Sequence, residues 1–109
     1  MLQILHSKAT QKQIDECAKD LQGYIKVVVD IDRKIIAAGG ERHVDGEQLL
    51  LSDGSSQKNL WGGGFDRDTK EIDYNSMINL RPADQNPSRE ILSAEIRKSF
   101  DSVAKAILW

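Results

Sequence analysis

The side chains best suited to chemistry in this chain are Glu41, His43 and Asp45. In an extended segment, these alternate positions place all three side chains on one face. Glutamate, imidazole and aspartate are ligand types of zinc and non-haem iron sites, and the same groups serve general acid–base catalysis. We therefore treat them as candidate catalytic residues and leave the presence of a metal or other cofactor open. The alternative is structural: Asp45 caps a helix, and the other two are solvated loop residues.

A second group of polar residues follows a long alternating segment and could hold a ligand. Guanidinium groups bind carboxylate or phosphate in a bidentate manner, and neighbouring amides add donors. A tryptophan that precedes a run of three glycines could stack on a ligand ring. The candidate ligand-binding residues are therefore Asn79, Arg81, Asn86, Ser88, Arg89 and Trp61. The structural alternatives are that the arginines bind nearby carboxylates and that the tryptophan fills the core or a dimer contact.

Two glycine runs, Gly39-Gly40 and Gly62-Gly63-Gly64, could bring main-chain amides close to an anion. However, no lysine with serine or threonine follows in the order of a phosphate-binding loop, and the dinucleotide-binding fingerprint also fails. The favoured interpretation is a bulge, or a close approach of the main chain to a neighbouring strand or side chain.

Two helices are predicted from caps followed by apolar stripes. Thr10 and Gln13 match a capping box, and the apolar positions behind them recur at spacings of three and four. Ser93 is a candidate cap for a C-terminal amphipathic helix that continues to Leu108. A short middle helix is expected over residues 45–51, although a strand centred on its leucines is the alternative.

The strand-like segments predict two hairpins. Residues 24–31 and 34–38 are joined by a short turn, so they pair antiparallel, because a parallel return needs a dozen or more residues. Residues 57–65 predict a strand interrupted by glycines, and residues 71–80 alternate as a strand with one face in water. Residues 1–6 could form a short edge strand.

These elements predict one α+β domain over residues 1–109. Its antiparallel sheet is built from the two β-hairpins, with an N-terminal helix, the short middle helix and the C-terminal amphipathic helix. The order of the strands in the sheet stays open, since hairpins do not determine how they pair with each other.

Composition excludes several classes of protein. No apolar stretch approaches the ~18 residues of a membrane span, and no secretory leader is recognised. With 15 Lys and Arg against 17 Asp and Glu, the net charge is −2, so nonspecific nucleic-acid binding is not expected. The single cysteine, Cys17, cannot form an internal disulfide, and we expect a cytoplasmic protein.

Three stretches together resemble a family of small, uncharacterised prokaryotic proteins catalogued as a domain of unknown function. They are Val28–Ile31 with Ala38–Glu41; His43–Leu50 with Asp53–Ser55 and Leu60–Gly62; and Ile78–Pro82 with Asn86–Ile91 and Ile96–Arg97. The resemblance covers roughly residues 24–108. It implies no activity, cofactor or substrate class.

The function is therefore unknown at this point, and two hypotheses follow. The favoured one is a binding or interaction module that acts as a homo-oligomer, most simply a homodimer, with a small anionic ligand as a further partner. The alternative is a small hydrolase or nuclease-like enzyme with a surface cleft around His43 and Arg81. In it, His43 acts as general base or metal ligand with Glu41 and Asp45 supporting it. Arg81 with Arg89 holds an anionic substrate.

Overall fold

The computed structural model describes residues 1–109 and contains one antiparallel sheet of five strands in the order β1-β3-β2-β4-β5. The strands are β1 (Gln3–Leu5), β2 (Tyr24–Asp30), β3 (Ile35–Ala38), β4 (Leu60–Asp66) and β5 (Ile72–Asp73). The helices are α1 (Gln11–Ala18), α2 (His43–Ser52) and α3 (Ala94–Leu108). The α+β class is confirmed, with the N-terminal helix following an edge strand. No helix has the length and apolar character needed to cross a membrane.

Both predicted hairpins form, β2 with β3 and β4 with β5. They join through the antiparallel pair β2–β4, in which Val28 lies opposite Gly62. This central pairing decides the strand order that the sequence left open.

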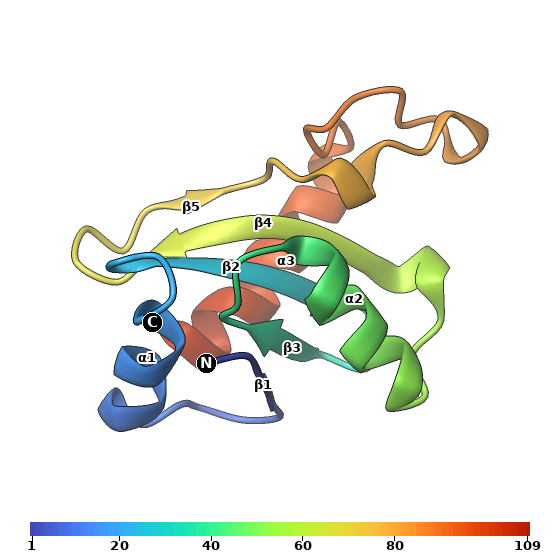
Figure 1. Ribbon diagram of the computed structural model, residues 1–109. Coiled ribbons are helices and arrows are strands. Elements are labelled where there is room, and N and C mark those ends of the chain that lie inside the picture. Colours follow the sequence, from blue (N-terminus) through green and yellow to red (C-terminus); the bar gives the residue numbers. More distant parts are fainter.

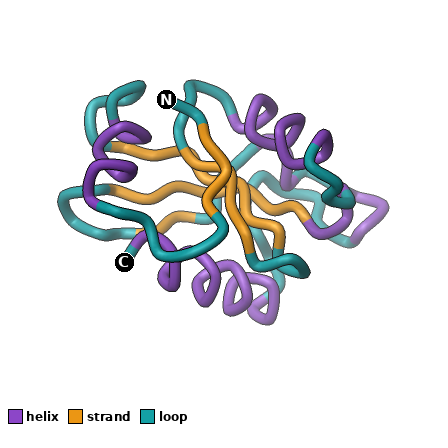
Figure 2. The backbone as a smooth tube through the Cα atoms, turned by 90° about the horizontal axis from the view of Figure 1, so that it is seen from below, coloured by secondary structure: helices purple, strands orange, loops and turns teal.

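The sheet is covered on both faces, as expected from the apolar composition of β2. Val27 and Val29 belong to the larger core cluster, together with buried residues of α1 and α3, whereas Val28 belongs to a smaller cluster with Leu50 of α2. In Figure 1, α2 lies in front of the sheet and α3 behind it, and Figure 2 shows the strands between helices. The face under α2 carries the candidate site.

The helix caps form as predicted. Thr10 and Gln13 make a reciprocal capping box at α1, and the Ser93 side chain accepts a hydrogen bond from the Ile96 amide at α3. The middle helix is confirmed, and it begins at His43, two residues before the expected start.

The prediction of a continuous strand over residues 71–80 is wrong, because β5 ends at Asp73 and residues 77–79 form a 3-10 turn. The Ser76 hydroxyl accepts from the Ile78 amide and starts that turn. The predicted interruption of the preceding strand is also wrong, since the three glycines lie inside β4. From Asn75 to Leu92 the chain then forms an arm that extends beyond β4 (Figure 1).

Candidate anion-binding site

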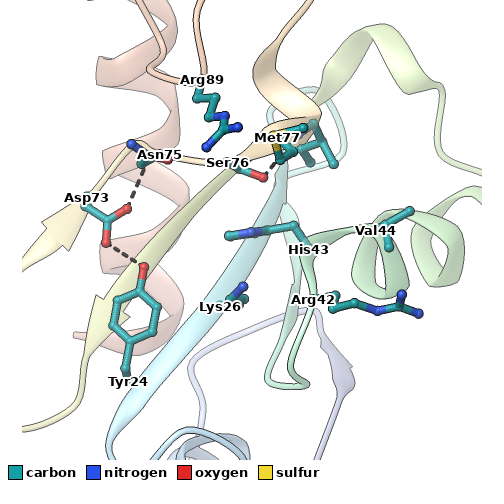
Figure 3. A pocket seen from close by; sticks show the side chains of 11 residues that line it. Tyr24, Lys26, Arg42, His43, Val44, Asp73, Asn75, Ser76, Met77 and Arg89 are labelled. Atoms are coloured by element: carbon teal, nitrogen blue, oxygen red, sulfur yellow. Dashed lines mark hydrogen bonds between the residues drawn. The ribbon is translucent and has the colours of Figure 1, made fainter.

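A cavity of about 540 Å³ opens on the α2 face of the sheet. Its lining comes from β2, from the beginning of α2, and from β5 and the arm (Figure 3). The lining residues are Tyr24, Lys26, Arg42, His43, Val44, Asp73, Asn75, Ser76, Met77, Ile78 and Arg89.

The glycines of β4 explain why these side chains can come together. A Cβ at Gly64 would collide with the Tyr24 hydroxyl and lie 2.6 Å from Asp73 Oδ2, and a Cβ at Gly62 would lie 2.6 Å from Ser76 Oγ. Three lining side chains therefore rest directly on the main chain of β4. The close approach that the glycine run predicted is confirmed.

Tyr24 and Asp73 form one wall of the cavity. The Tyr24 hydroxyl donates to Asp73 Oδ2 over 2.6 Å. Burial raises the pKa of Tyr24, and the hydrogen bond to the carboxylate and its charge raise it further. Tyr24 therefore stays protonated, and the carboxylate it faces is hydrogen-bonded but forms no ion pair.

His43 is held against the strand by a 2.6 Å contact between its Nε2 and the Gly63 carbonyl oxygen. Burial lowers the pKa of His43, and the charge of Lys26 lowers it further, while the Gly63 carbonyl and Asp73 act in the opposite direction. The imidazole is therefore neutral at pH 7. Since a carbonyl only accepts hydrogen bonds, Nε2 carries the proton and Nδ1 keeps a lone pair.

Two cations that line the cavity, Lys26 and Arg89, form no ion pair. In the view of Figure 3, the His43 ring lies between Lys26 below it and Arg89 above it. The third cation, Arg42, points away from them and pairs with Asp45 at 3.2 Å.

The N-terminus of α2 also lies at the cavity. Its first residues line the cavity, and no side chain caps the helix there. The N-terminus of a helix carries a partial positive charge. The electrostatics of the site are thus positive, although the chain as a whole carries a net charge of −2.

Of the three candidate catalytic residues, the cavity includes His43 alone. The segment is helical from His43 onward, so the shared face of an extended segment does not form. Asp45 instead pairs with Arg42, and Glu41 is exposed. No group of three or more His, Cys, Asp or Glu side chains is arranged to hold a metal ion.

Two of the candidate ligand-binding residues, Asn79 and Asn86, are buried, and their side-chain amides form hydrogen bonds with main-chain groups. The Asn79 amide accepts from the Gly62 N–H at 2.8 Å and donates to the Gly62 carbonyl at 2.9 Å. Asn86 donates to three carbonyls of the arm and accepts from the Leu92 amide. Asn79 thus holds the arm against β4, whereas Asn86 stabilises the arm internally.

Of the other four ligand-binding candidates, three have structural roles and one lines the cavity. Arg81 stacks on Trp61 with its guanidinium carbon 4.2 Å from the ring centroid, and it donates to the Leu60 carbonyl. Trp61 itself is part of the core, and Ser88 accepts from the Glu90 amide within the arm. Arg89 is the member of this group that lines the cavity.

Several residues that line the cavity were not identified from the sequence. Tyr24 and Lys26 lie in a segment interpreted only as a covered strand, and Asp73, Asn75 and Ser76 in one interpreted as a solvated strand. One signal was available: Lys26 is the single charged residue between Tyr24 and Val29. A lysine in an otherwise apolar central strand indicates a polar cavity on that face.

A family model matches residues 3–107, which is nearly the whole chain, and its description is "Protein of unknown function (DUF5674)". The chain belongs to this family. The DUF5674 match confirms the resemblance to a domain of unknown function and extends it to the N-terminal strand and helix. Every residue that lines the cavity lies within the matched range. Searches of the curated proteins and of the solved structures found no match.

Proposed function

We propose that this member of the DUF5674 family binds a small anion bearing a phosphoryl group in the cavity described above. The observation that carries the proposal is that Lys26 and Arg89, from different parts of the chain, line one cavity and neither forms an ion pair, while Asp73 is the one carboxylate in the lining. Lys26 is half-buried. Partial removal of the Lys26 ammonium from water costs free energy, which an anionic ligand would offset, whereas Arg89 is exposed.

A phosphoryl group fits the charge pattern better than a singly charged group does. Two cations match its two negative charges, and charge-assisted hydrogen bonds to phosphate are among the strong ones. The N-terminus of α2 adds partial positive charge. A cavity lined by positive charge also concentrates anions, even in a chain of negative net charge.

Neutral His43 supplies selectivity in this proposal. Its position is set by the bond from Nε2 to Gly63 O. Its Nδ1 lone pair can accept a hydrogen bond from the protonated oxygen of hydrogen phosphate or from a hydroxyl on the organic part of a ligand. A protonated imidazole could not do so.

Binding is better supported here than the hydrolase or nuclease-like alternative. That alternative relied on Glu41 and Asp45 supporting His43, and on Arg81 holding the substrate. None of those three residues lines the cavity with His43. An anion-binding role needs only the residues that do line it.

The homo-oligomer and the cytoplasmic location stay predictions beside this proposal. Uncovered apolar area on the C-terminal helix or at residues 49–51 would favour a dimer. The apolar stripe of α3 and the side chain of Leu50 are buried within the chain itself. Cys17 is a buried free thiol, which supports a reducing compartment. Sedimentation velocity tests the oligomer prediction directly.

Isothermal titration calorimetry with inorganic phosphate tests the proposed function. Lys26→Ala and Arg89→Ala are each expected to weaken binding about tenfold or more, because each removes a charged hydrogen-bond donor worth about 1.5–3 kcal/mol. Lys98→Ala is the matched control, because Lys98 is exposed on α3 and does not line the cavity. Absence of phosphate binding at millimolar concentration, or equal weakening by Lys98→Ala, contradicts the proposal.

A further inference from the structure

The cavity is larger than a phosphate ion requires. It measures about 540 Å³. A phosphate has five non-hydrogen atoms and fills roughly a quarter of that space, taking about 30 Å³ per water-sized group. The remaining volume is within the range typical of sites for small organic molecules.

Part of the remaining lining is apolar. Val44 and Met77 are 41% and 60% exposed, two of the six large hydrophobic side chains that the chain leaves exposed. Ile78, which follows Met77, also lines the cavity. Val44 is the second residue of α2 and Met77 the first of the 3-10 turn, so the apolar wall is formed by two elements.

This arrangement places apolar surface beside the cations of the same cavity. Scattered exposed hydrophobic residues need no explanation, but apolar side chains beside convergent polar groups are typical of ligand sites. Methionine suits such a wall because its unbranched thioether adapts to a bound ring and makes favourable contacts with it.

We propose that the ligand is an organic phosphate monoester whose apolar or aromatic group contacts Val44 and Met77, while its phosphoryl group contacts Lys26 and Arg89. This inference rests on the proposed function and adds the chemical class of the ligand. A ring that covers both side chains is expected to strengthen binding about tenfold over phosphate alone.

Calorimetry with three probes tests the inference: inorganic phosphate, phenyl phosphate and glycerol phosphate, the last being a polar monoester. Phenyl phosphate is expected to bind about tenfold tighter than either of the others. In the double variant Val44→Ser/Met77→Ser this advantage falls below about threefold, while the affinity for inorganic phosphate is unchanged. Both substituted side chains are exposed, so the fold is retained.

A second readout locates the ring directly. The chain has two methionines, Met1 and Met77, so labelling the methionine methyl groups with ¹³C gives two NMR signals. Phenyl phosphate is expected to shift the Met77 methyl signal by the ring current and to leave Met1 unchanged. Inorganic phosphate is expected to produce no comparable shift.

The outcomes separate this inference from the proposed function. If inorganic phosphate binds and phenyl phosphate binds no tighter, the inference fails and the anion site stands. If phenyl phosphate binds tighter but leaves the Met77 methyl signal unmoved, its ring lies elsewhere and the inference also fails. If no probe binds, both proposals fail.

Discussion

Replacing Asn79 by alanine removes the side chain that joins β4 to the arm. In an antiparallel strand, the N–H and C=O of one residue point to the same side. Both groups of Gly62 bond to the Asn79 amide, so they point away from β2. The amide thus takes the place of a neighbouring strand, and Asn79→Ala leaves both Gly62 groups buried without a partner.

The magnitude follows from counting the groups that lose their last partner. Asn79 also donates to the carbonyls of Tyr74 and Arg89, but each of these keeps a main-chain donor, Ile91 N and Ser76 N respectively. Two orphaned buried groups at about 1–3 kcal/mol each predict a loss near 3 kcal/mol in the free energy of unfolding. For a domain of this size, the melting temperature falls by roughly 12 °C.

Urea denaturation followed by circular dichroism measures this loss. The matched control is Asn59→Ala, since the Asn59 side chain is partly exposed and no side-chain hydrogen bond of it is present. The control is expected to stay within about 0.5 kcal/mol of the parent. A loss below about 1 kcal/mol for Asn79→Ala would refute the reasoning, because it would mean that Gly62 needs no partner from this side chain.

Gly64→Ala is expected to destabilise the protein by about 1–3 kcal/mol, because a Cβ there collides with the Tyr24 hydroxyl. Urea denaturation of Gly64→Ala/Tyr24→Phe should show partial recovery, and an equal or larger loss contradicts the steric cause. Stability is also expected to fall as the pH drops below about 6.5, the ordinary pKa of histidine. The folded pKa of His43 is lowered, so the unfolded chain takes up that proton first, and the slope reaches at most about 1.4 kcal/mol per pH unit. Denaturation from pH 7.5 to 5.5 should give a flatter dependence of stability on pH for His43→Gln than for the parent protein, and an unchanged dependence contradicts this reasoning.

The sequence predicted correctly those parts of the fold in which the interacting residues are close together along the chain. Thr10 and Gln13 cap the helix that they begin, and Ser93 does the same for α3. The β2–β3 hairpin followed from its short turn. The caps and the hairpin depend on residues a few positions apart, so a short segment of sequence is enough to predict them.

The strand predicted over residues 71–80 shows where local patterns fail. Its alternation was real, but a strand also needs a neighbour along its whole length. Beyond Asp73 the buried amide of Asn79 takes that place beside Gly62, and the chain turns at Ser76. Alternation alone does not reveal a side chain acting as a strand partner.

The candidate site was predicted in part for a similar reason. His43 and Arg89 were identified from their chemistry, and both line the cavity. Lys26 and Asp73 lie in segments interpreted only as strands. The pairing of β2 with β4 and of β4 with β5 brings them together, and the strand order was the feature that the sequence left open.

The glycine run of β4 has a consequence for how this cavity can diversify. Three of the side chains that line the cavity rest on the main chain of Gly62 and Gly64. A side chain added at either position would therefore push these lining residues out of place, so it could not adjust the cavity to a new ligand. Adaptation to a different ligand must therefore proceed at the rim, where Val44 and Met77 are exposed and free to vary. A library that randomises these two positions and preserves the glycines would sample new specificities on an unaltered scaffold.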